Sequence, residues 1–314
     1  MLKPIQILLV LLLSTSCFAQ TTAGSMAGSF LRVGVSGRTK AMGNAGTALA
    51  SGYSTSFDNP AFLPALKQRN IGLTMHRLAL DRKFAHLAYA MPLKGGAGIS
   101  LSWINAGVDD IDSRDTDGSP LPALDYRDNA FALGFAISPV PDRVSIGLNF
   151  KVFYGLFPGI KDDGKSIKGT GVGFDIGGRV ELPYNITAAF VLKDLNSKYT
   201  WNTEGYWSQG TTKIDKYPVQ TRIGLSYRWR ELTAAIDGEF LKGIQKLHTG
   251  AEYRFFKVDR YDALLRAGID GKAPTFGLGL AMPFSTVKAR LDYAYIVESI
   301  APEDTHVLSW MVNF

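Results

Sequence analysis

Hydrophobic and polar residues alternate along most of the chain beyond residue 70. In the stretch 144–152, every even-numbered residue is apolar and every odd-numbered residue is small or polar. The stretches 219–229, 261–270 and 287–295 repeat this period of two. Successive side chains of a β-strand point to opposite faces, so the pattern predicts strands with one apolar and one polar face.

About fourteen such stretches follow one another, which is more than a soluble β-sandwich of about 100 residues contains. Strands of about 9–11 residues are also what a tilted bilayer crossing requires. We therefore predict an all-β fold, a transmembrane outer-membrane β-barrel of about 14 antiparallel strands, with apolar side chains toward lipid and charges toward an aqueous lumen. The predicted strands are 70–78, 84–92, 96–104, 129–138, 143–153, 170–181, 184–192, 217–229, 231–241, 246–256, 260–270, 274–283, 286–296 and 305–314.

The connections between these strands alternate between short and long. Short turns are expected at 93–95, 139–142, 182–183 and 257–259, and long loops at 105–128, 154–169 and 193–216. Short periplasmic turns and long extracellular loops are typical of outer-membrane barrels. An even number of strands places both ends of the barrel on the short-turn side. The last stretch, 308–314, finishes on Phe314 and resembles the C-terminal assembly signal of bacterial outer-membrane barrels.

The N-terminus has the features of an export signal. A basic start at 1–3 and an apolar run at 5–13 precede the small-residue site 16–19. We predict a signal peptide over 1–19, cleaved near Ala19. A lipoprotein in which Cys17 is the lipidated residue is the alternative. Cys17 is the single cysteine, so cleavage after Ala19 would leave no disulfide in the exported protein.

The stretch 37–66 breaks the strand pattern. It is rich in glycine and alanine, and it ends in the breaker cluster 58–60. Small residues allow a backbone to pack closely inside a larger structure, whereas Asn-Pro ends a helix. A glycine- and alanine-rich linker is the alternative interpretation.

The charge distribution and the candidate motifs restrict the possible functions. The net charge of +6 comes from bases that alternate with acids, which argues against nucleic-acid binding. The four histidines are scattered, and the GxxxxGKS match at 159–166 lacks the strand–loop–helix context of a phosphate site. We predict no enzyme activity, no cofactor and no metal. The charges expected to line the lumen as ion-paired neighbours include Arg222, Arg228, Asp237, Glu239, Glu252, Arg254, Arg266, Lys288, Arg290 and Asp292.

Both ends of the mature chain resemble one family. The N-terminal stretch carries the motif residues Gly43, Gly46, Asn59, Pro60 and Ala61, and the stretch 289–295 precedes a last strand that contains His306. Together they resemble the PorV/PorQ family, which belongs to the larger group of FadL-like outer-membrane barrels. The resemblance implies a fourteen-stranded barrel at 69–314 and a plug at 20–68, which contains a short helix and folds into the lumen.

The resemblance also implies a function. PorV-type proteins escort exported proteins in type IX secretion, and PorQ-type proteins belong to a surface-attachment complex. We therefore expect a non-enzymatic barrel in the outer membrane of a Gram-negative bacterium, with lipid and secretion-complex proteins or exported cargo as partners. Two alternatives are a FadL-like transporter with a hydrophobic ligand and a purely structural pore. Aromatic residues suited to partner binding lie in one predicted loop, at Tyr199, Trp201, Tyr206 and Trp207.

Overall fold

The computed structural model describes residues 26–158, 166–203, 210–259, 261–284, 287–299 and 301–314. The signal peptide predicted over 1–19 lies outside the described residues. So do Tyr206 and Trp207 of the predicted partner loop, and most of the GxxxxGKS match at 159–166.

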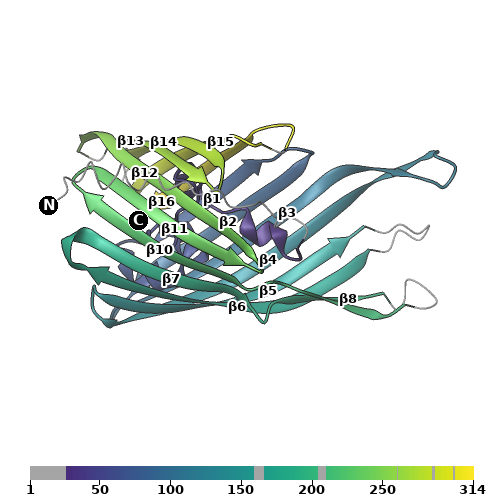
Figure 1. The fold of residues 1–314 in the computed structure, drawn as a ribbon, viewed down its shortest axis with the longest axis horizontal. Helices are drawn as coiled ribbons and strands as arrows, with labels where there is room; N and C mark the ends of the chain where they lie inside the picture. Colours follow the sequence, from purple (N-terminus) through teal and green to yellow (C-terminus); the bar gives the residue numbers. More distant parts are fainter. Residues whose placement is uncertain (1–25, 159–165, 204–209, 260, 285–286, 300) are drawn as a thin grey trace.

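Within the described residues, sixteen antiparallel strands form one sheet that closes on itself. Fourteen of them make the barrel, and β8 and β9 extend it at one end (Figure 1). Closure joins β1 to β16, where Asn70 pairs with Asn313. The predicted all-β, fourteen-stranded antiparallel barrel is therefore confirmed. The strands are β1 Asn70–Arg77, β2 Arg82–Leu93, β3 Ala97–Arg114, β4 Pro120–Val140, β5 Val144–Phe157, β6 Ile167–Leu182, β7 Ile186–Leu195, β8 Lys198–Asn202, β9 Thr212–Lys216, β10 Gln220–Trp229, β11 Leu232–Leu241, β12 Ile244–Val258, β13 Tyr261–Asp270, β14 Ala273–Phe284, β15 Val287–Ile296 and β16 Thr305–Asn313.

The alternating pattern gives the wall two different faces. On β5, Ile146 and Leu148 are exposed on the outside, whereas Asn149 and Lys151 are buried inside. Large apolar side chains are exposed in the same way on most strands, and an exposed apolar band around a closed barrel is the surface that lipid covers. No helix among the described residues is long and apolar enough to cross a membrane.

The wall is much taller on one side than on the other (Figure 1). The prediction of a loop at 105–128 is wrong, because β3 continues to Arg114 and β4 starts at Pro120. The stretch 193–216 likewise holds the end of β7 and all of β8 and β9, and β5 and β6 shorten the expected loop at 154–169. We call the raised parts of β3–β6, with β8 and β9, the tall wall. On β3, Asp110, Asp112 and Arg114 are exposed in this part, so the apolar alternation ends there although backbone pairing continues.

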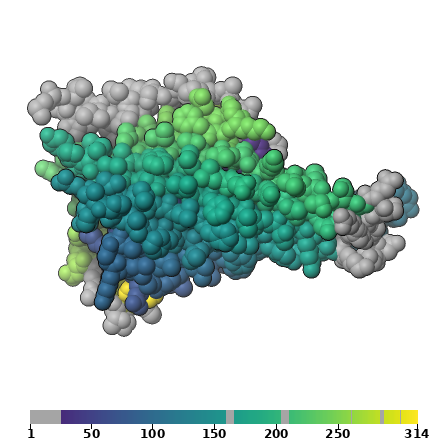
Figure 2. Space-filling model, turned by 90° about the horizontal axis from the view of Figure 1, so that it is seen from below, coloured from purple at the N-terminus to yellow at the C-terminus, as the bar shows by residue number. Residues whose placement is uncertain are grey.

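Residues 26–66 lie inside the barrel, and we call them the plug. In the view of Figure 2, few atoms of this segment, coloured purple, are visible between those of the wall. Its elements are short: η2 Ser29–Arg32, α2 Gly37–Ala41, η3 Gly52–Ser54, α3 Thr55–Asp58 and η4 Pro60–Ala65. α2 packs on β13–β16 and η4 packs on β2–β6, so the plug contacts opposite sides of the wall. The predicted domain boundary at 68/69 stays a prediction.

Candidate functional site

Glycines of the wall make room for η4. A Cβ at Gly177 would lie 2.0 Å from Asn59 Oδ1, and one at Gly147 would lie 2.5 Å from the Pro60 carbonyl carbon. Gly98 faces Leu63 in the same way, at 2.6 Å from its backbone. Because no real Cβ approaches other atoms this closely, the wall and the plug fit only where the wall has no side chain.

Asn59 fixes the plug to itself and to the wall. Its Oδ1 accepts a hydrogen bond from the Ala61 amide at 3.0 Å, which caps η4. Its Nδ2 donates to the carbonyls of Thr47 at 3.0 Å, Phe190 at 3.1 Å and Gly178 at 3.3 Å. Pro60 takes the first helical position, where a missing N–H costs nothing. The motif residues Asn59, Pro60 and Ala61 therefore join the plug to β6 and β7.

Gly43 and Gly46 have different surroundings. Gly43 has a φ of 64°, and a Cβ there would lie 2.3 Å from the Thr249 carbonyl oxygen of β12. Only glycine combines this conformation with so close an approach to the wall. Gly46 packs inside the plug, where a Cβ would lie 3.1 Å from the Asp58 carboxyl carbon.

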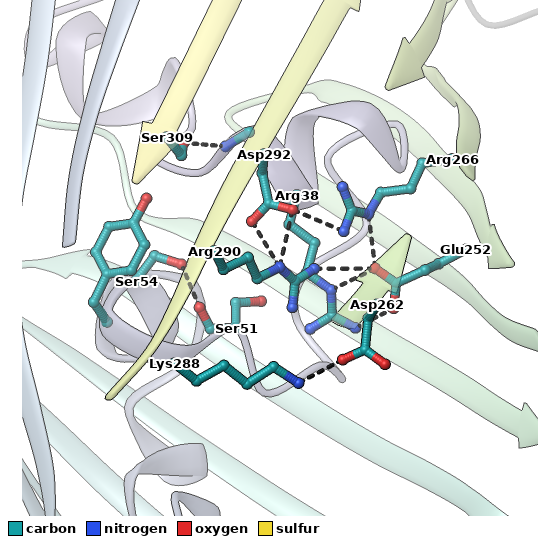
Figure 3. A network of polar contacts seen from close by, with 12 residues as sticks. Arg38, Ser51, Ser54, Glu252, Asp262, Arg266, Lys288, Arg290, Asp292 and Ser309 are labelled. Carbon is teal, nitrogen blue, oxygen red and sulfur yellow. Dashed lines mark hydrogen bonds and ion pairs between the residues drawn. The ribbon is translucent and has the colours of Figure 1, made fainter. Parts of the chain in front are cut away.

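A first ion network links the plug to β12, β13 and β15 (Figure 3). Arg38 of α2 donates to both carboxylate oxygens of Glu252, at 2.7 and 2.9 Å. Arg266 lies between Glu252 at 2.7 Å and Asp292 at 2.8 Å. Arg290 contacts the same two carboxylates at 3.5 and 2.9 Å. Three guanidinium groups therefore share two carboxylates, and one of the three belongs to the plug.

A second ion network lies beside it on β10–β13. Lys40 of α2 contacts Asp270 at 2.8 Å. The His248 ring lies between Asp270 at 3.0 Å and Glu239 at 3.2 Å. Arg222 binds Asp237 at 3.1 Å, and its guanidinium also donates to the Asn44 carbonyl of the plug. Charged side chains of this half of the wall therefore hold two further points of the plug.

A third polar group lies on β5–β7. Lys151 lies against Asp175 at 2.6 Å and against Asp194, and all three side chains are buried. Asn149 exchanges hydrogen bonds with Ser56 of α3, at 2.6 Å to its hydroxyl and 2.7 Å to its carbonyl. Polar contacts therefore fix the plug on this side of the barrel as well.

Above these networks, an aromatic cluster fills the lumen on the tall-wall side. Its buried members are Phe30, Leu31, Val35, Phe84, Ile104, Ala106, Ala130, Phe153, Tyr199 and Tyr217, and Ala27, Val33, Phe57, Leu78 and Trp201 pack against them. Phe153 is fully buried, with its ring 5.1 Å from that of Tyr217 and 6.0 Å from that of Tyr199. Phe30 and Leu31 enter the cluster from the plug, whereas its other large aromatic members come mostly from the wall.

The charges predicted for the lumen fall into two groups. Seven lie in the first two networks: Arg222, Asp237, Glu239, Glu252, Arg266, Arg290 and Asp292. The other three lie toward the short-turn end, where Lys288 contacts Asp262 at 2.5 Å, Arg254 contacts Glu231 at 3.2 Å, and Arg228 is exposed.

The described aromatic residues of the predicted partner loop do not form an exposed patch. Tyr199 is 4% exposed, and its hydroxyl donates to Asp128 at 2.9 Å inside the barrel. Trp201 is half-buried, and its indole N–H donates to Asp215 at 2.9 Å. These two residues belong to the strand β8 instead, and alternation along that strand turns both of them inward.

Sequence reasoning missed several residues of the networks, namely Arg38, Lys40, Lys151, Asp175, Asp194 and His248. Lys151 lies on the polar face of the 144–152 pattern, so the alternation could have found it. Arg38 and Lys40 lie in a five-residue helix that is too short to show a period.

Little room is left between the plug and the wall. A polar cavity of about 10 Å³ lies there, with room for about one water molecule, and its lining includes Asp58, Lys193 and Arg222. Among the described residues, no group of three or more His, Cys, Asp or Glu side chains could hold a metal ion.

No family model and no curated protein sequence matches this chain. Solved structures do resemble it. The toluene transporter TbuX of Ralstonia pickettii superposes with a TM-score of 0.61 at 12% identity, over 90% of this chain and 98% of TbuX. The CymD monoaromatic hydrocarbon channel has a TM-score of 0.56 at 13% identity, over 90% and 97% of the two chains. A FadL homologue of Pseudomonas aeruginosa has a TM-score of 0.54 at 12% identity, over 86% and 95%.

The chain has the fold of FadL-like outer-membrane channels. At these identities the similarity concerns the fold alone. The three proteins are described as transporters, channels or FadL homologues, and none of them is described as an enzyme or as a PorV or PorQ protein.

Proposed function

We propose that this protein is an outer-membrane channel that binds hydrophobic small molecules and moves them into the cell envelope. The aromatic cluster carries the proposal, because it is an apolar site inside a lumen that is otherwise charged. Ligand sites for apolar compounds are concave, lined by apolar and aromatic side chains, and enclosed by a rigid wall.

Two of the side chains that fill the cluster belong to a short segment of the plug. Phe30 and Leu31 belong to η2, near the start of the plug, and are buried in the same cluster as the wall residues Phe84 and Phe153. A movement of η2 alone would empty the space that these two side chains occupy. A small apolar ligand would then take their place and bury a similar area against the same rings.

The route beyond the cluster has to avoid the ion networks, since these charges make the direct path down the lumen unfavourable for an apolar molecule. Beside the cluster, the pairing of β6 with β7 shifts register between Phe174 and Ile176. Gly171 and Gly173 of β6 face the interior there, and Asp194 of β7 has a φ of 62°. Irregular, glycine-rich wall is easily rearranged, so we propose a sideways exit toward the lipid beside Gly171 and Gly173, which come before the buried ion pairs of Asp175 and Asp194 with Lys151.

The proteins of similar fold support the same proposal. TbuX is described as a toluene transporter and CymD as a monoaromatic hydrocarbon channel. A flat aromatic hydrocarbon is also a suitable substitute for Phe30 among the rings of the cluster.

Binding of toluene to the full-length protein in detergent tests the proposal. Trp201 reports on the site, because its ring lies 5.0 Å from that of Tyr199. We expect a saturable change in tryptophan emission that Phe153→Ala weakens at least tenfold. Phe150→Ala is the matched control, because Phe150 lies on the outer face of the same strand. An emission change that does not saturate, or equal effects of the two substitutions, would contradict the proposal.

A role in type IX secretion, as a PorV- or PorQ-type protein, is the second candidate. The motif around Asn59-Pro60-Ala61 and the similarity of the C-terminal stretch to that family support it. Affinity purification from the native outer membrane, with mass spectrometry of proteins and lipids, separates the two candidates. Co-purifying secretion subunits or exported proteins support secretion, whereas a lone barrel with stoichiometric apolar ligand supports the channel.

A further inference from the structure

The tall wall ends in a strand with a free edge. β9 pairs with β8 on one side, and it is the last strand of the sheet among the described residues. Its other side would face a continuation of β11, but β11 ends at Leu241, the partner of Gln220. Among the described residues, no strand therefore occupies the position beside β9, which we call the open place.

The register of β8 and β9 shows which backbone groups point to this free edge. Tyr217 donates its N–H to Ser197 at 2.9 Å, and Thr203 donates its N–H to Thr211 at 3.2 Å. Hydrogen-bonded pairs alternate along an antiparallel ladder, so Lys213 and Asp215 are bonded to β8. The N–H and C=O groups of the intervening residues, Thr212, Ile214 and Lys216, therefore point outward.

The level of this edge is above the lipid. Where β8 joins β6, at Gly169 and Thr170, the neighbouring Lys168 is exposed to solvent. The exposed apolar residues of β6, Val172 and Ile176, begin only below this level. The edge of β9 thus meets water rather than acyl chains.

Lysines surround the edge. Lys213 is 73% exposed at its side chain and Lys216 is exposed. Lys242 lies in the turn after β11, directly below the open place, and Lys272 lies in the next turn of the rim. Asp215 is the acid on β9; its carboxylate accepts the hydrogen bond from Trp201 and lies 3.7 Å from the Lys213 ammonium, so it offsets one of these four charges. The charge beside the open edge is therefore positive.

We propose that the free edge of β9 binds an extended, acidic segment of another protein, which adds to the tall wall as one more strand. Backbone hydrogen bonds from Thr212, Ile214 and Lys216 would provide the affinity, and the lysines would select acidic side chains. Edge lysines discourage pairing with other chains in general, but they attract a strand of opposite charge. This binding is independent of the aromatic cluster.

The tall wall has a second free edge, on β3. β3 extends beyond Val108, the partner of Arg82, so its last residues also lack a neighbour on that side. Its pairing with β4 shifts register twice there, and Asp110 has a φ of 54°. Bulges of this kind bend an edge and impair further pairing. No register shift interrupts β9 along β8, so β9 is the edge suited to a partner.

A labelled short peptide of alternating glutamate and valine tests the proposal, with fluorescence anisotropy on the full-length protein in detergent. We expect saturable binding that Ile214→Pro weakens at least tenfold. Proline at this position removes one outward N–H and leaves the hydrogen bonds to β8 in place, which Ile214→Val controls. Lys213→Glu combined with Lys216→Glu should reverse the preference in favour of a lysine–valine peptide.

A second measurement keeps the test decisive if the proline variant does not fold. In the unmodified protein, the acidic peptide should slow hydrogen exchange at the amides of Thr212, Ile214 and Lys216 more than at those of Lys213 and Asp215. Absence of saturable binding, or binding without this alternating protection, would overturn the proposal. So would self-association through β9, because the occupant would then be a second copy. Toluene binding should be unchanged in all of these variants and in the presence of the peptide.

Discussion

Removing Arg38 should release the plug without weakening the barrel. Arg38 donates two hydrogen bonds to Glu252 and a third to the Ala50 carbonyl at 2.7 Å, and its side chain is 13% exposed. In Arg38→Met, the wall keeps two guanidinium groups, Arg266 and Arg290, opposite the two carboxylates Glu252 and Asp292. The wall network therefore stays balanced in charge, and only the plug loses its contact.

The expected size of this effect follows from the hydrogen bonds. A hydrogen bond to a charged group contributes about 1.5–3 kcal/mol, so losing two of them costs the seated plug roughly 3 kcal/mol or more. Since each 1.4 kcal/mol is about a factor of ten, the ratio of released to seated plug should rise about 100-fold. Single-channel recording of the protein in planar bilayers measures this ratio as the fraction of time spent in a conducting state.

Two further variants make the reasoning refutable. Glu252→Gln leaves three guanidinium groups opposite one carboxylate, so it should also lower the free energy of unfolding of the barrel, by about 3–5 kcal/mol. Arg254→Met is the control, because Arg254 pairs with wall residues and is 36% exposed at its side chain. Equal fractions of time in the conducting state for Arg38→Met and Arg254→Met would refute the inference that Arg38 holds the plug in place. So would a loss of barrel stability in Arg38→Met as large as that in Glu252→Gln, measured by urea unfolding in detergent.

Three more outcomes follow from the contacts between plug and wall. Gly177→Ala should lower the urea midpoint of the folded protein because a Cβ would collide with Asn59, whereas Gly238→Ala, whose Cβ has 3.5 Å of room, should not. Asn59→Asp keeps the cap on η4 but loses the donor to three carbonyls and buries a charge, so it should cost about 3 kcal/mol or more by the same assay and raise protease access to the plug. Phe153→Ala should cost about 3–5 kcal/mol of unfolding free energy, and toluene should raise the melting temperature of this variant less than that of the unmodified protein, because the variant binds toluene more weakly.

The sequence predicts the membrane part of the wall well, and the reason is physical. Lipid demands apolar side chains on one face, so Ile146 and Leu148 alternate visibly with the residues between them. Above the lipid that demand ends, and the continuation of β3 through Asp109 and Asp112 looks like a polar loop. Backbone hydrogen bonds hold this part of the strand, and they require no particular pattern of side chains.

The candidate site was predictable only where the alternation extends into the lumen. Glu252 and Arg266 were expected on the inner face, and they lie there. Their partner Arg38 could not be assigned, because nothing in a five-residue helix tells which wall strand it will meet. Tyr199 was expected in an exposed loop, since the hairpin of β8 and β9 has no long apolar run that would mark it as strand.

The seating of the plug also sets an order of events during assembly. The Gly37 amide binds the Ser309 hydroxyl at 2.8 Å across 272 positions of the chain, and Arg38 reaches Glu252 across 214. Contacts between such distant residues form late, because the intervening chain must first be brought together. α2 can therefore dock only after β15 and β16 have been made. The plug is made early in synthesis and must remain undocked until the last strands are present. Any factor that keeps the plug away from the wall until then would determine whether the finished barrel contains its plug.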